Sequence, residues 1–530
     1  MWSVDDQGRG DAPGGKGGPR MTGRISAQVM VVGGGPVGML IAAQLAAQGV
    51  DTVVLESEAT TSERPKATTL HARAVQCLAR RGYFFAPESR PVGRTATMPF
   101  HFAGIPGLSI TAPEAEPDPI MKRPQVELER LFESRARSNG ARVLREHRVT
   151  EMVQDRDGVR VTAETPQGRR TFDLEYVVGA DGARSTVREM AGIASDVSSP
   201  TMSAMMGLVR IPDDQAIPVG WHRTPRGWLI VKKGADGHTL IHTLASGDGS
   251  SNRHVPLTLD ELSSQVSWIV GHEVTMTDPR WLSRFSDFTR LARTYRAGRF
   301  FLAGDAAHVH FPIGGQGLST GVLDALNLSW KLALVVRGAA ADGLLDTYGL
   351  ERRPAAQKVI ENTRAQVALM GPGTELDSLR TLLTGLLESG RGNDFLSGMI
   401  SAQDTVLPAS PSYRSPQEGT FLHNLELTTA KGQSDLIGLL GEGGEPLLLL
   451  FGEGGRSYAD TARAWERSLR VAHCLPTRSV PFSAVLVRPD GYVAWASDGG
   501  GPLADALAAL FGMDASRRPV AAPDLEKVPA

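Results

Sequence analysis

The stretch VMVVGGGPVGMLIAAQLAAQGVDTVVLE, residues 29 to 56, has the order strand, glycine turn, helix and second strand. This order predicts a parallel βαβ unit. Three glycines, Gly33, Gly35 and Gly38, follow the first strand at GxGxxG spacing. Gly33 permits a tight turn, Gly35 lets the backbone approach a diphosphate, and Gly38 lets the helix pack closely on the strand. The stretch therefore predicts a dinucleotide-binding site.

The two ends of this unit supply groups that would contact a nucleotide. Pro36 and Val37 open the helix, whose free N–H groups and positive dipole end favour phosphate binding. Glu56 stands at the tip of the second strand and is followed by Ser57. A carboxylate there accepts hydrogen bonds from both hydroxyls of a ribose and repels a 2′-phosphate. This favours FAD or NAD over NADP in this site.

Two alternatives for this stretch are weaker. A chance GxGxxG in a glycine-rich chain would not explain why strand, turn, helix and acidic tip all agree. The segment is uncharged for long enough to suggest a membrane span, but the Gly-Gly-Gly-Pro within it argues against one. We therefore expect no membrane as a partner.

Composition describes a globular chain without a strong charge. Its 530 residues, 41% of them hydrophobic, can bury a large core in roughly two to four domains. The formal net charge of −2 gives no reason to expect a nucleic acid as a partner. Cys77 and Cys474 match neither a CxxC pair nor a metal cluster, so we expect buried thiols, no metal site and a cytoplasmic location.

A second motif, VVGADGARSTVR, spans residues 177 to 188. Asp181 lies in an Asp-Gly turn directly after a buried strand, and Ser185 is placed to cap the helix that follows. An Asp-Gly turn alone is common, but one that leaves a buried strand with Ser and Arg at fixed offsets is not. The spacing therefore indicates more than a simple turn.

A third motif, GDAAHVHFPIGGQGLSTGVLDALNL, spans residues 304 to 328 and follows a predicted strand. Gly304 and Asp305 end that strand, and a glycine-rich loop then opens a long helix. Asp305 is placed to bind hydroxyls, and the amides from Gly317 to Ser319 are placed to stabilise an anion. Two glycine-rich turns before helix N-termini predict contact with two ends of one extended ligand.

Basic residues after the first unit are further candidates. Lys66 and Arg73 fall where a loop returning past the nucleotide could place cations on its phosphates. A solvated surface is the alternative for both. The sequence alone does not choose between the two interpretations.

Short alternating segments from about 200 to 295 predict an antiparallel sheet. Its aromatic and imidazole side chains are candidates for a substrate platform. Packing on the sheet face is the preferred interpretation for each one alone. The candidates are Trp221, His222, Trp228 and His242.

The last hundred or so residues predict a separate unit, because a buried strand, a hairpin turning at Asp490-Gly491 and a final helix follow one another. This order is typical of a thioredoxin-like module. The module has no CxxC, so packing or an oligomer contact such as a homodimer is its expected role.

The expected division of the chain follows from these patterns and from accumulations of Gly, Pro and Ser. The parts are a disordered tail at 1–24, a nucleotide-binding domain at 25–199 with an irregular excursion near 90–120, the antiparallel sheet at 200–295, the rest of the nucleotide-binding domain with a helical linker at 296–415, and the thioredoxin-like module at 416–530.

With these motifs in place, the chain resembles the class A flavin-dependent aromatic hydroxylases of the para-hydroxybenzoate hydroxylase fold, from about residue 25 to 525. The three motifs together carry the resemblance, and LVRPDGYVAWA at 486–496 is similar to the end of the C-terminal module of phenol and polyketide hydroxylases. The resemblance implies an α/β fold with a GR2-type Rossmann-like FAD-binding domain, an inserted antiparallel β-sheet substrate domain and a C-terminal thioredoxin-like domain.

The resemblance also implies roles for individual residues. Pro312, Gly317, Leu318 and Ser319 would lie along the isoalloxazine ring. Lys66 stands where the family commonly has Arg, so Arg73 would take more of the phosphate contact. Ser319 stands where the family commonly has Asn, so the backbone there would contact the flavin instead of a side-chain amide. The expected cofactor contacts are Gly33, Gly35, Pro36, Val37, Gly38, Glu56, Ser57, Lys66, Arg73, Gln125, Asp181, Gly304, Asp305, Pro312, Gly315, Gln316, Gly317, Leu318 and Ser319.

The activity implied is monooxygenation of an aromatic polyketide or another phenolic substrate. NADPH or NADH would reduce FAD, O2 would add at flavin C4a, and the hydroperoxide would pass one oxygen atom to an electron-rich ring. Baeyer–Villiger insertion and oxidative inactivation of an antibiotic are alternatives on the same fold. An FAD-binding protein or reductase without oxygen transfer is the alternative from another class. No base for a phenol can be read from the sequence.

Overall fold

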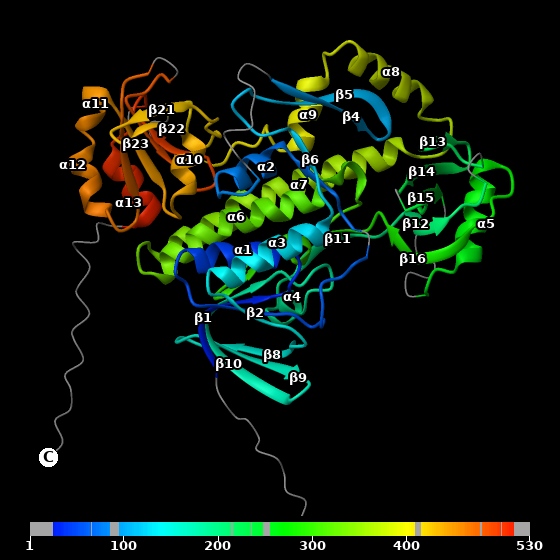
Figure 1. Ribbon diagram of the computed structural model, residues 1–530, viewed down its shortest axis with the longest axis horizontal. Coiled ribbons are helices and arrows are strands. Elements are labelled where there is room, and N and C mark those ends of the chain that lie inside the picture. The colour runs from blue at the N-terminus through cyan, green and yellow to red at the C-terminus, as the bar shows by residue number, and fades with distance from the viewer. Residues whose placement is uncertain are drawn as a thin grey trace, which may run out of the picture.

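The structure is a computed structural model that describes residues 25 to 512 without 65, 85–94, 214–215, 235, 247–254, 409–414, 478–479 and 500. Two long helices, α6 (Gly317–Val336) and α7 (Asp346–Leu369), run through its centre (Figure 1). An antiparallel sheet and a C-terminal domain lie at opposite ends of these helices, and a mainly parallel sheet lies below them. The predicted tail at 1–24 lies outside the described residues.

The main sheet forms around the apolar strand of the first motif. β1 is buried over most of its length because it pairs in parallel with β10 on one side and β2 on the other. The strand order is β18 (Arg296–Ala297), β19 (Phe300–Leu302), β10 (Gly168–Gly179), β1 (Ile25–Val32), β2 (Thr52–Leu55) and β7 (Arg142–Leu144), and β9 (Val159–Thr165) and β8 (Arg148–Gln154) extend it from β10.

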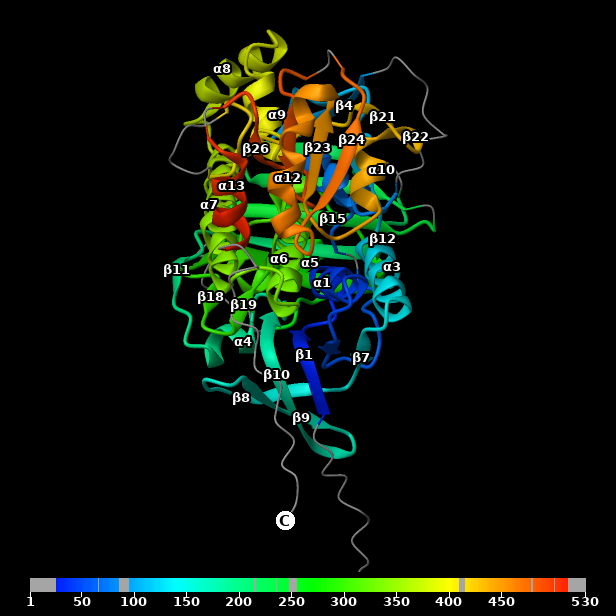
Figure 2. The same ribbon diagram turned by 90° about the vertical axis from the view of Figure 1, so that its left-hand side faces the viewer.

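Helices cover this sheet and place the motifs at one edge of it. α1 (Pro36–Ala47) packs against α3 (Gln125–Ser138) and α6. The predicted cap of the second motif is confirmed, because Ser185 Oγ accepts a hydrogen bond from the Arg188 N–H and starts α4 (Thr186–Met190). The view of Figure 2 shows α1 and α6 between the main sheet and the C-terminal domain.

The predicted antiparallel sheet has five strands, and α5 (Leu259–Val270) covers one of its faces. Alternation along each strand sends Leu229 and Val231 toward α5, so Trp228 and Ile230 lie on the opposite face. The strand order is β13 (Gly220–Thr224), β14 (Gly227–Lys233), β15 (Thr239–Ser246), β12 (Met202–Arg210) and β16 (Thr277–Ser286).

The region near 90–120 is regular in its described part, where an irregular excursion was expected. β4 (Ala96–Phe102) and β5 (Ile105–Ala112) form a hairpin. Its turn, Ala103-Gly104, has φ values of 53° and 80°, so a hairpin forms without the Asn-Gly or Asp-Gly signal. The remaining elements of this part are α2 (Ala72–Ala79), α8 (Asp377–Glu388), α9 (Asn393–Ser401), the pair β3 (Thr69–His71) with β6 (Ile120–Lys122), and the sheet of β11 (Ser195–Ser198), β17 (Thr289–Ala292) and β20 (His308–Val309).

The C-terminal domain has the strand–helix–strand–hairpin–helix order of a thioredoxin-like fold. β23 and β24 are parallel, and β25 and β26 continue the sheet antiparallel to them. Its strands, in spatial order, are β22 (Gly432–Asp435), β21 (Glu426–Thr429), β24 (Arg470–Cys474), β23 (Leu447–Phe451), β25 (Ala484–Val487) and β26 (Val493–Ala496), and its helices are α10 (Leu436–Gly441), α11 (Gly452–Arg456), α12 (Ala459–Ala462) and α13 (Leu503–Phe511).

A buried ionic network joins this domain to the two central helices. Arg488, before the predicted turn at Asp490, donates to both oxygens of Glu351 in α7 at 2.8 and 2.7 Å and also pairs with Asp490. Lys331 in α6 donates to Glu351 at 2.8 Å and to Asn327 at 2.9 Å. Two positive and two negative charges therefore balance one another inside the interface.

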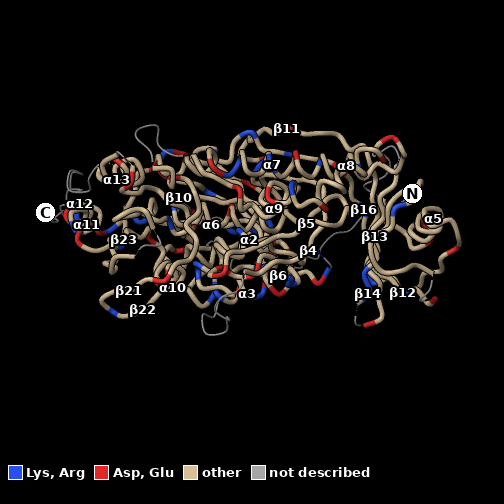
Figure 3. Tube along the Cα trace, turned by 90° about the horizontal axis from the view of Figure 1, so that it is seen from above, with Lys and Arg blue, Asp and Glu red and all other residues tan. Residues whose placement is uncertain are grey.

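The outer surface is mixed in charge. Blue positions (Lys and Arg) and red positions (Asp and Glu) are interspersed along the traced chain (Figure 3). Among the described residues, no helix combines the length and apolar character needed to cross a membrane.

Candidate functional site

The glycine loop between β1 and α1 leaves room for a ligand at one position. An added Cβ on Gly33 would lie 2.4 Å from the Ala180 carbonyl oxygen, and one on Gly38 would lie 2.1 Å from the Gly33 carbonyl oxygen. A Cβ on Gly35 would meet nothing within 4 Å, although its φ of −71° suits any residue. Packing therefore explains Gly33 and Gly38, while the open space at Gly35 fits the approach of a diphosphate.

Glu56 lies against this loop, as expected. Its Oε2 accepts a hydrogen bond of 2.6 Å from the Gly34 N–H, and its Oε1 accepts one of 2.7 Å from the Glu58 N–H. The Ser57 hydroxyl also donates to Oε1, at 3.3 Å. The carboxylate is thereby fixed at the mouth of the loop, where its remaining lone pairs can accept from a ribose.

The second motif meets the first at the ends of their strands. Gly33 approaches the Cα of Asp181 closely enough that an added Cβ would lie 2.8 Å from it. Asp181 Oδ2 accepts a hydrogen bond from the Val187 N–H at 3.1 Å, but Oδ1 is buried without a partner. Desolvation raises the pKa of this carboxyl. An unpaired buried carboxylate oxygen beside the glycine loop fits a ligand that donates a hydrogen bond.

Val37 joins the third motif to the first. A Cβ added to Gly304 would lie 3.0 Å from a methyl of Val37, and one added to Gly321 would lie 2.6 Å from the same methyl. Asp305 follows Gly304 and is accessible to solvent, yet desolvation by the surrounding protein raises its pKa, opposed by His308 and Lys66. The Asp305 carboxyl can be reached by solvent but is surrounded by protein atoms. This is expected of a group that lines a concave site and does not extend into bulk water.

The loop before α6 is held by contacts that the sequence did not reveal. The imidazole of His71 is fully buried, and its Nε2–H donates to the Gly314 carbonyl at 2.7 Å. The His71 backbone N–H donates to Ser319 Oγ at 2.9 Å. Desolvation lowers the pKa of His71 to about 4, so the ring is neutral and its Nδ1 is an acceptor without a partner.

Gln316 and Ser319 therefore differ in how their side chains are used. Gln316 Oε1 accepts from Asn362 at 3.1 Å, while its Nε2 is buried without a partner. Ser319 Oγ is occupied by the His71 backbone, which leaves the backbone amides at the start of α6 for a ligand. Pro312 is exposed, Gly315 and Gly317 are partly exposed, and Leu318 is buried beside them.

The expected phosphate contact of Arg73 is wrong. Its guanidinium is buried and donates to the carbonyls of Ala402 and Gln403 and to the side chain of Gln76. It also lies 3.7 Å from the centre of the Phe421 ring. Each of its three nitrogens therefore donates within the protein, to α2 and to the linker, and the side chain points away from the glycine loop contacts expected of it.

Lys66 and Gln125 remain close to the recess. Lys66 is exposed, and its charge lowers the pKa of Asp305 against the larger effect of desolvation. Gln125 begins α3, and its side-chain amide donates to Glu129 at 2.8 Å. The ammonium of Lys66 is thus free to meet a phosphate, whereas the Gln125 side chain is held by Glu129.

Three of the four substrate candidates lie on one face of the antiparallel sheet. Trp221 pairs with Ile230, which pairs with His242, so the three lie in one row, and Trp228 lies on the same face. His222 lies on the opposite face because it follows Trp221 directly, and its Nε2–H donates to the Pro218 carbonyl at 2.7 Å. The prediction for His222 is therefore wrong. We call the Trp221 side of the sheet the substrate face.

Some side chains of the substrate face are buried by packing, and others are accessible to a ligand. Trp228 is buried and donates from its indole N–H to the Met370 carbonyl at 2.7 Å, so it is a packing residue. Trp221 and His242 are partly exposed, and desolvation lowers the pKa of His242 to about 4. The side chain of Phe285 continues this face toward Phe311, at a ring separation of 5.5 Å.

Two further imidazoles extend this surface. His101 in β4 lies 4.5 Å from the Trp221 ring and 4.7 Å from Phe100, measured between ring centres. His310 donates from Nδ1 to the Phe311 carbonyl at 2.9 Å, and its Nε2 lies beside Gly317. Desolvation lowers the pKa of each to about 4. The sequence placed both in motifs or loops but offered no signal for their convergence.

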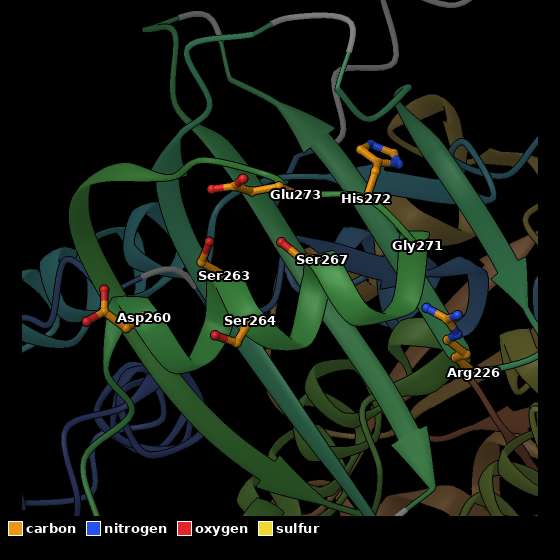
Figure 4. Close-up of a pocket in the computed structure, with 8 residues that line it drawn as sticks. All are labelled: Arg226, Asp260, Ser263, Ser264, Ser267, Gly271, His272 and Glu273. Carbon is orange, nitrogen blue, oxygen red and sulfur yellow. The ribbon is translucent and has the colours of Figure 1, made fainter.

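A separate hollow lies on the outer side of α5, on the opposite face of the sheet. Its side chains come from α5 and its neighbouring loops and point outward without converging on one point (Figure 4). It contains none of the predicted site residues. The described residues also contain no group of three or more His, Cys, Asp or Glu that could hold a metal ion.

Comparison with known proteins gives the same assignment along nearly the whole chain. Residues 26–363 match the family described as FAD binding domain, and residues 415–513 match the family described as aromatic-ring hydroxylase, C-terminal. The structure matches that of an anhydrotetracycline hydroxylase from Streptomyces rimosus with a TM-score of 0.83 at 34% identity, covering 93% of this chain and 100% of the other.

Curated relatives have related but different activities. A 12-dehydrotetracycline 5-monooxygenase/anhydrotetracycline 6-monooxygenase of Streptomyces rimosus is 35% identical, covering 91% of this chain and 98% of its own. A rifampicin monooxygenase of Rhodococcus hoagii is 35% identical, covering 92% and 99%. A dialkyldecalin synthase of Streptomyces rugosporus is also 35% identical, covering 92% and 99%.

These matches confirm the predicted fold, enzyme class and cofactors. The recess between the three motifs fits FAD, because it combines open space at Gly35, the fixed carboxylate of Glu56 and the unpaired oxygen of Asp181. The protein is a monooxygenase that uses FAD, NAD(P)H and O2. The chain therefore belongs to the family of FAD-dependent aromatic-ring hydroxylases.

Proposed function

We propose that this enzyme hydroxylates a polycyclic phenolic substrate of the aromatic polyketide type on the substrate face. The observation that carries this proposal is the position of the accessible side chains of Trp221, His242 and His101 near the loop that begins α6. One indole and two neutral imidazoles are flat aromatic groups that suit a planar ring system with polar substituents. The polyketide-oxidising relatives support the same substrate class.

The residues of the recess divide into two groups by what they would hold. Gly35 and the first turn of α1 would take the diphosphate of FAD, and Glu56 would take a ribose. Asp305 and the amides from Gly317 to Ser319 would hold the other end of the cofactor. When bound, FAD supplies electron transfer from NAD(P)H and activation of O2.

The remaining residues position this machinery and exclude water. His71 holds the loop before α6 in place. Its ring donates a hydrogen bond to the Gly314 carbonyl, and its backbone N–H donates one to Ser319 Oγ. Neutral imidazoles at His101, His242 and His310 offer hydrogen-bonding groups without adding a charge. The β4–β5 hairpin packs Gly104 against Trp221 and Trp228, which closes one side of the substrate face.

The test is to purify the protein with FAD, supply NADPH and a panel of aromatic polyketides, and determine product masses. A gain of one oxygen atom with the carbon skeleton intact, placed by NMR on an aromatic ring, supports the proposal. A lactone would instead show Baeyer–Villiger insertion. NADPH oxidation that yields only hydrogen peroxide with every substrate would contradict the proposal.

Two alternatives each have a relative in their favour. The rifampicin monooxygenase supports oxidative modification of an antibiotic, and the relative named a dialkyldecalin synthase instead of a monooxygenase keeps open a role without oxygen transfer. Loss of antibacterial activity of the product separates the first from biosynthetic hydroxylation. Conversion of a substrate without consumption of O2 would establish the second.

We also infer that the enzyme is a cytoplasmic homodimer. Two buried free cysteines, Cys77 and Cys474, suit a reducing compartment. Large apolar side chains on α8 and α9 are 42–71% exposed and support self-association. The test is sedimentation of the wild type and of Leu382→Glu, which should shift a dimer toward the monomer. These side chains are Leu379, Leu382, Leu386 and Phe395.

A further inference from the structure

Two lysines lie at one end of the substrate face without a negative partner. Lys232 is in β14, two residues beyond Ile230 and four beyond Trp228, so it is on the same face as both. Lys122 ends β6, which pairs with β3 next to the loop before α6. Ile230 pairs with His242 and Lys232 with Leu240, so Lys232 and His242 are diagonal neighbours on this face. The positive charge of Lys232 lowers the pKa of His242, His101 and Lys122.

The charge of this cluster is not balanced. Lys122 donates to the neutral hydroxyl of Thr69 at 2.8 Å. Within the described part of the chain, the ammonium of Lys232 has no hydrogen bond or ion pair, and no carboxylate pairs with either lysine. The neighbouring imidazoles of His101 and His242 are neutral at physiological pH, because desolvation lowers the pKa of each to about 4.

Both ammonium groups are partly desolvated by the surrounding protein. Each lysine is exposed to solvent, yet desolvation by surrounding protein lowers the pKa of each. Desolvating a cation without a counterion costs free energy, which a bound anion would recover. The rings of Trp221 and His101 lie beside the cluster, and the face of either ring can pack against an aromatic ligand.

We propose that Lys232, with Lys122 beside it, binds an ionised oxygen of the aromatic substrate, a phenolate or an enolate conjugated with the ring system. Lys232 is then a specificity-determining residue that selects substrates able to carry this charge. The inference rests on the proposed function, because it deepens the substrate class of the same face. An ionised oxygen also enriches the ring in electrons, which favours attack by an electrophilic oxygen donor.

The binding test uses a dye and needs no turnover. Alizarin (1,2-dihydroxyanthraquinone) changes its visible absorption when a phenol ionises, and its dimethyl ether cannot ionise. Each is titrated with the FAD-loaded wild type and with Lys232→Met, Lys232→Arg and Lys233→Met. Lys233 is the matched control, because it is the next residue and lies on the α5 face.

The wild type should lower the pKa of bound alizarin by about one unit, a tenfold preference for the ionised form. Lys232→Met should remove most of this preference, while Lys232→Arg should keep it and Lys233→Met should match the wild type. The dimethyl ether should bind all four proteins alike. In turnover, Lys232→Met should raise KM for a phenolic substrate more than it lowers kcat.

Equal titrations of the dye with wild type and Lys232→Met would overturn the inference, as would failure of the wild type to bind the dye. An increase in KM for NADPH alone would show a nucleotide-phosphate site instead and would equally overturn it. Failure of the proposed function has a different signature, because the dye would still bind as an anion while no oxygenated product formed.

Discussion

Two regions of the molecule use charged residues in opposite ways. One is the interface between the central helices and the C-terminal domain. The other is the proposed ligand site, which consists of the cofactor recess and the substrate face. At the interface, Lys331, Glu351, Arg488 and Asp490 are buried and pair completely with one another. Beside the substrate face, Lys232 has no counterion among the described residues, and beside the glycine loop Asp181 keeps an unpaired oxygen.

This contrast separates structural from functional polar groups. Burial of a charge is costly, so a network that serves the fold alone is expected to close on itself. A charged group that is desolvated but has no partner destabilises the folded protein, and a ligand that pairs with it removes this cost. The balanced network therefore suits a structural attachment, and the unbalanced groups are the ones that we propose bind ligands.

The largest effect is expected from a substitution at Gly35, in the proposed cofactor recess. Gly35→Asp adds a side chain and a negative charge to the open space that fits the diphosphate. We expect FAD binding to be abolished, as measured by the absorbance of the purified protein and by flavin titration. Gly385→Asp is the control, because Gly385 lies in α8 and also has nothing within 4 Å of an added Cβ. A Gly35→Asp protein that stays yellow contradicts the assignment.

A change at the balanced interface should act on stability instead. Arg488→Met leaves the carboxylates of Glu351 and Asp490 buried without their main partner. We expect a loss of about 3–5 kcal/mol in the free energy of unfolding, measured by urea denaturation.

The matched control is Arg463→Met, whose surface pair with Asp460 is largely exposed and contributes about 0–1 kcal/mol. If both substitutions cost the same small amount, the interface network is not a structural attachment and the contrast between the two regions fails.

Acid should lower the free energy of unfolding through the buried neutral imidazole of His71. The pKa of His71 is about 4 in the folded protein, below the ordinary value of 6.5, so the unfolded state binds the proton first as pH falls. Stability is therefore unaffected above pH 6.5 and falls between pH 6.5 and 4. For His71 the loss between pH 6.5 and 5 is about 2 kcal/mol.

His71→Gln should flatten this part of the stability profile, as measured by thermal unfolding of the FAD-loaded protein at a series of pH values. His222→Gln is the control, because His222 lies on the outer face of the sheet and is partly exposed. Parallel profiles for wild type and His71→Gln would disprove the role of the buried imidazole.

The smallest effect is expected at the start of α6. Ser319→Ala leaves the buried N–H of His71 without its acceptor, which should cost about 1–2 kcal/mol and increase the release of hydrogen peroxide per NADPH consumed. Ser329→Ala, in the same helix, removes only a bond to the Ala325 carbonyl and should leave this ratio unchanged. An unchanged peroxide ratio in Ser319→Ala would argue against the positioning role of this contact.

Local patterns were sufficient to predict the fold and the three motifs. The GxGxxG turn, the capped helix at Ser185 and the strand before Gly304 each depend on neighbouring residues, and the structure brings them together as the βαβ order requires. The β4–β5 hairpin escaped prediction because its Ala-Gly turn lacks a recognised signal.

The other errors and omissions concern contacts between distant segments. Trp221 and His222 are neighbours in one strand, so they face opposite sides, and only the position of α5 decides which side faces the site. Arg73 is held by residues about 330 positions away. Lys232 and Lys122 become a cluster only after the antiparallel sheet meets β6.

The most direct test of the central claim is a crystal structure of the protein with FAD. We predict the diphosphate within hydrogen-bonding distance of the first turn of α1 at Gly35, a ribose on Glu56, and the isoalloxazine ring beside Gly317, facing the side chains of Trp221 and His242. A flavin bound elsewhere, or a ring separated from the substrate face by the β4–β5 hairpin, would contradict the account.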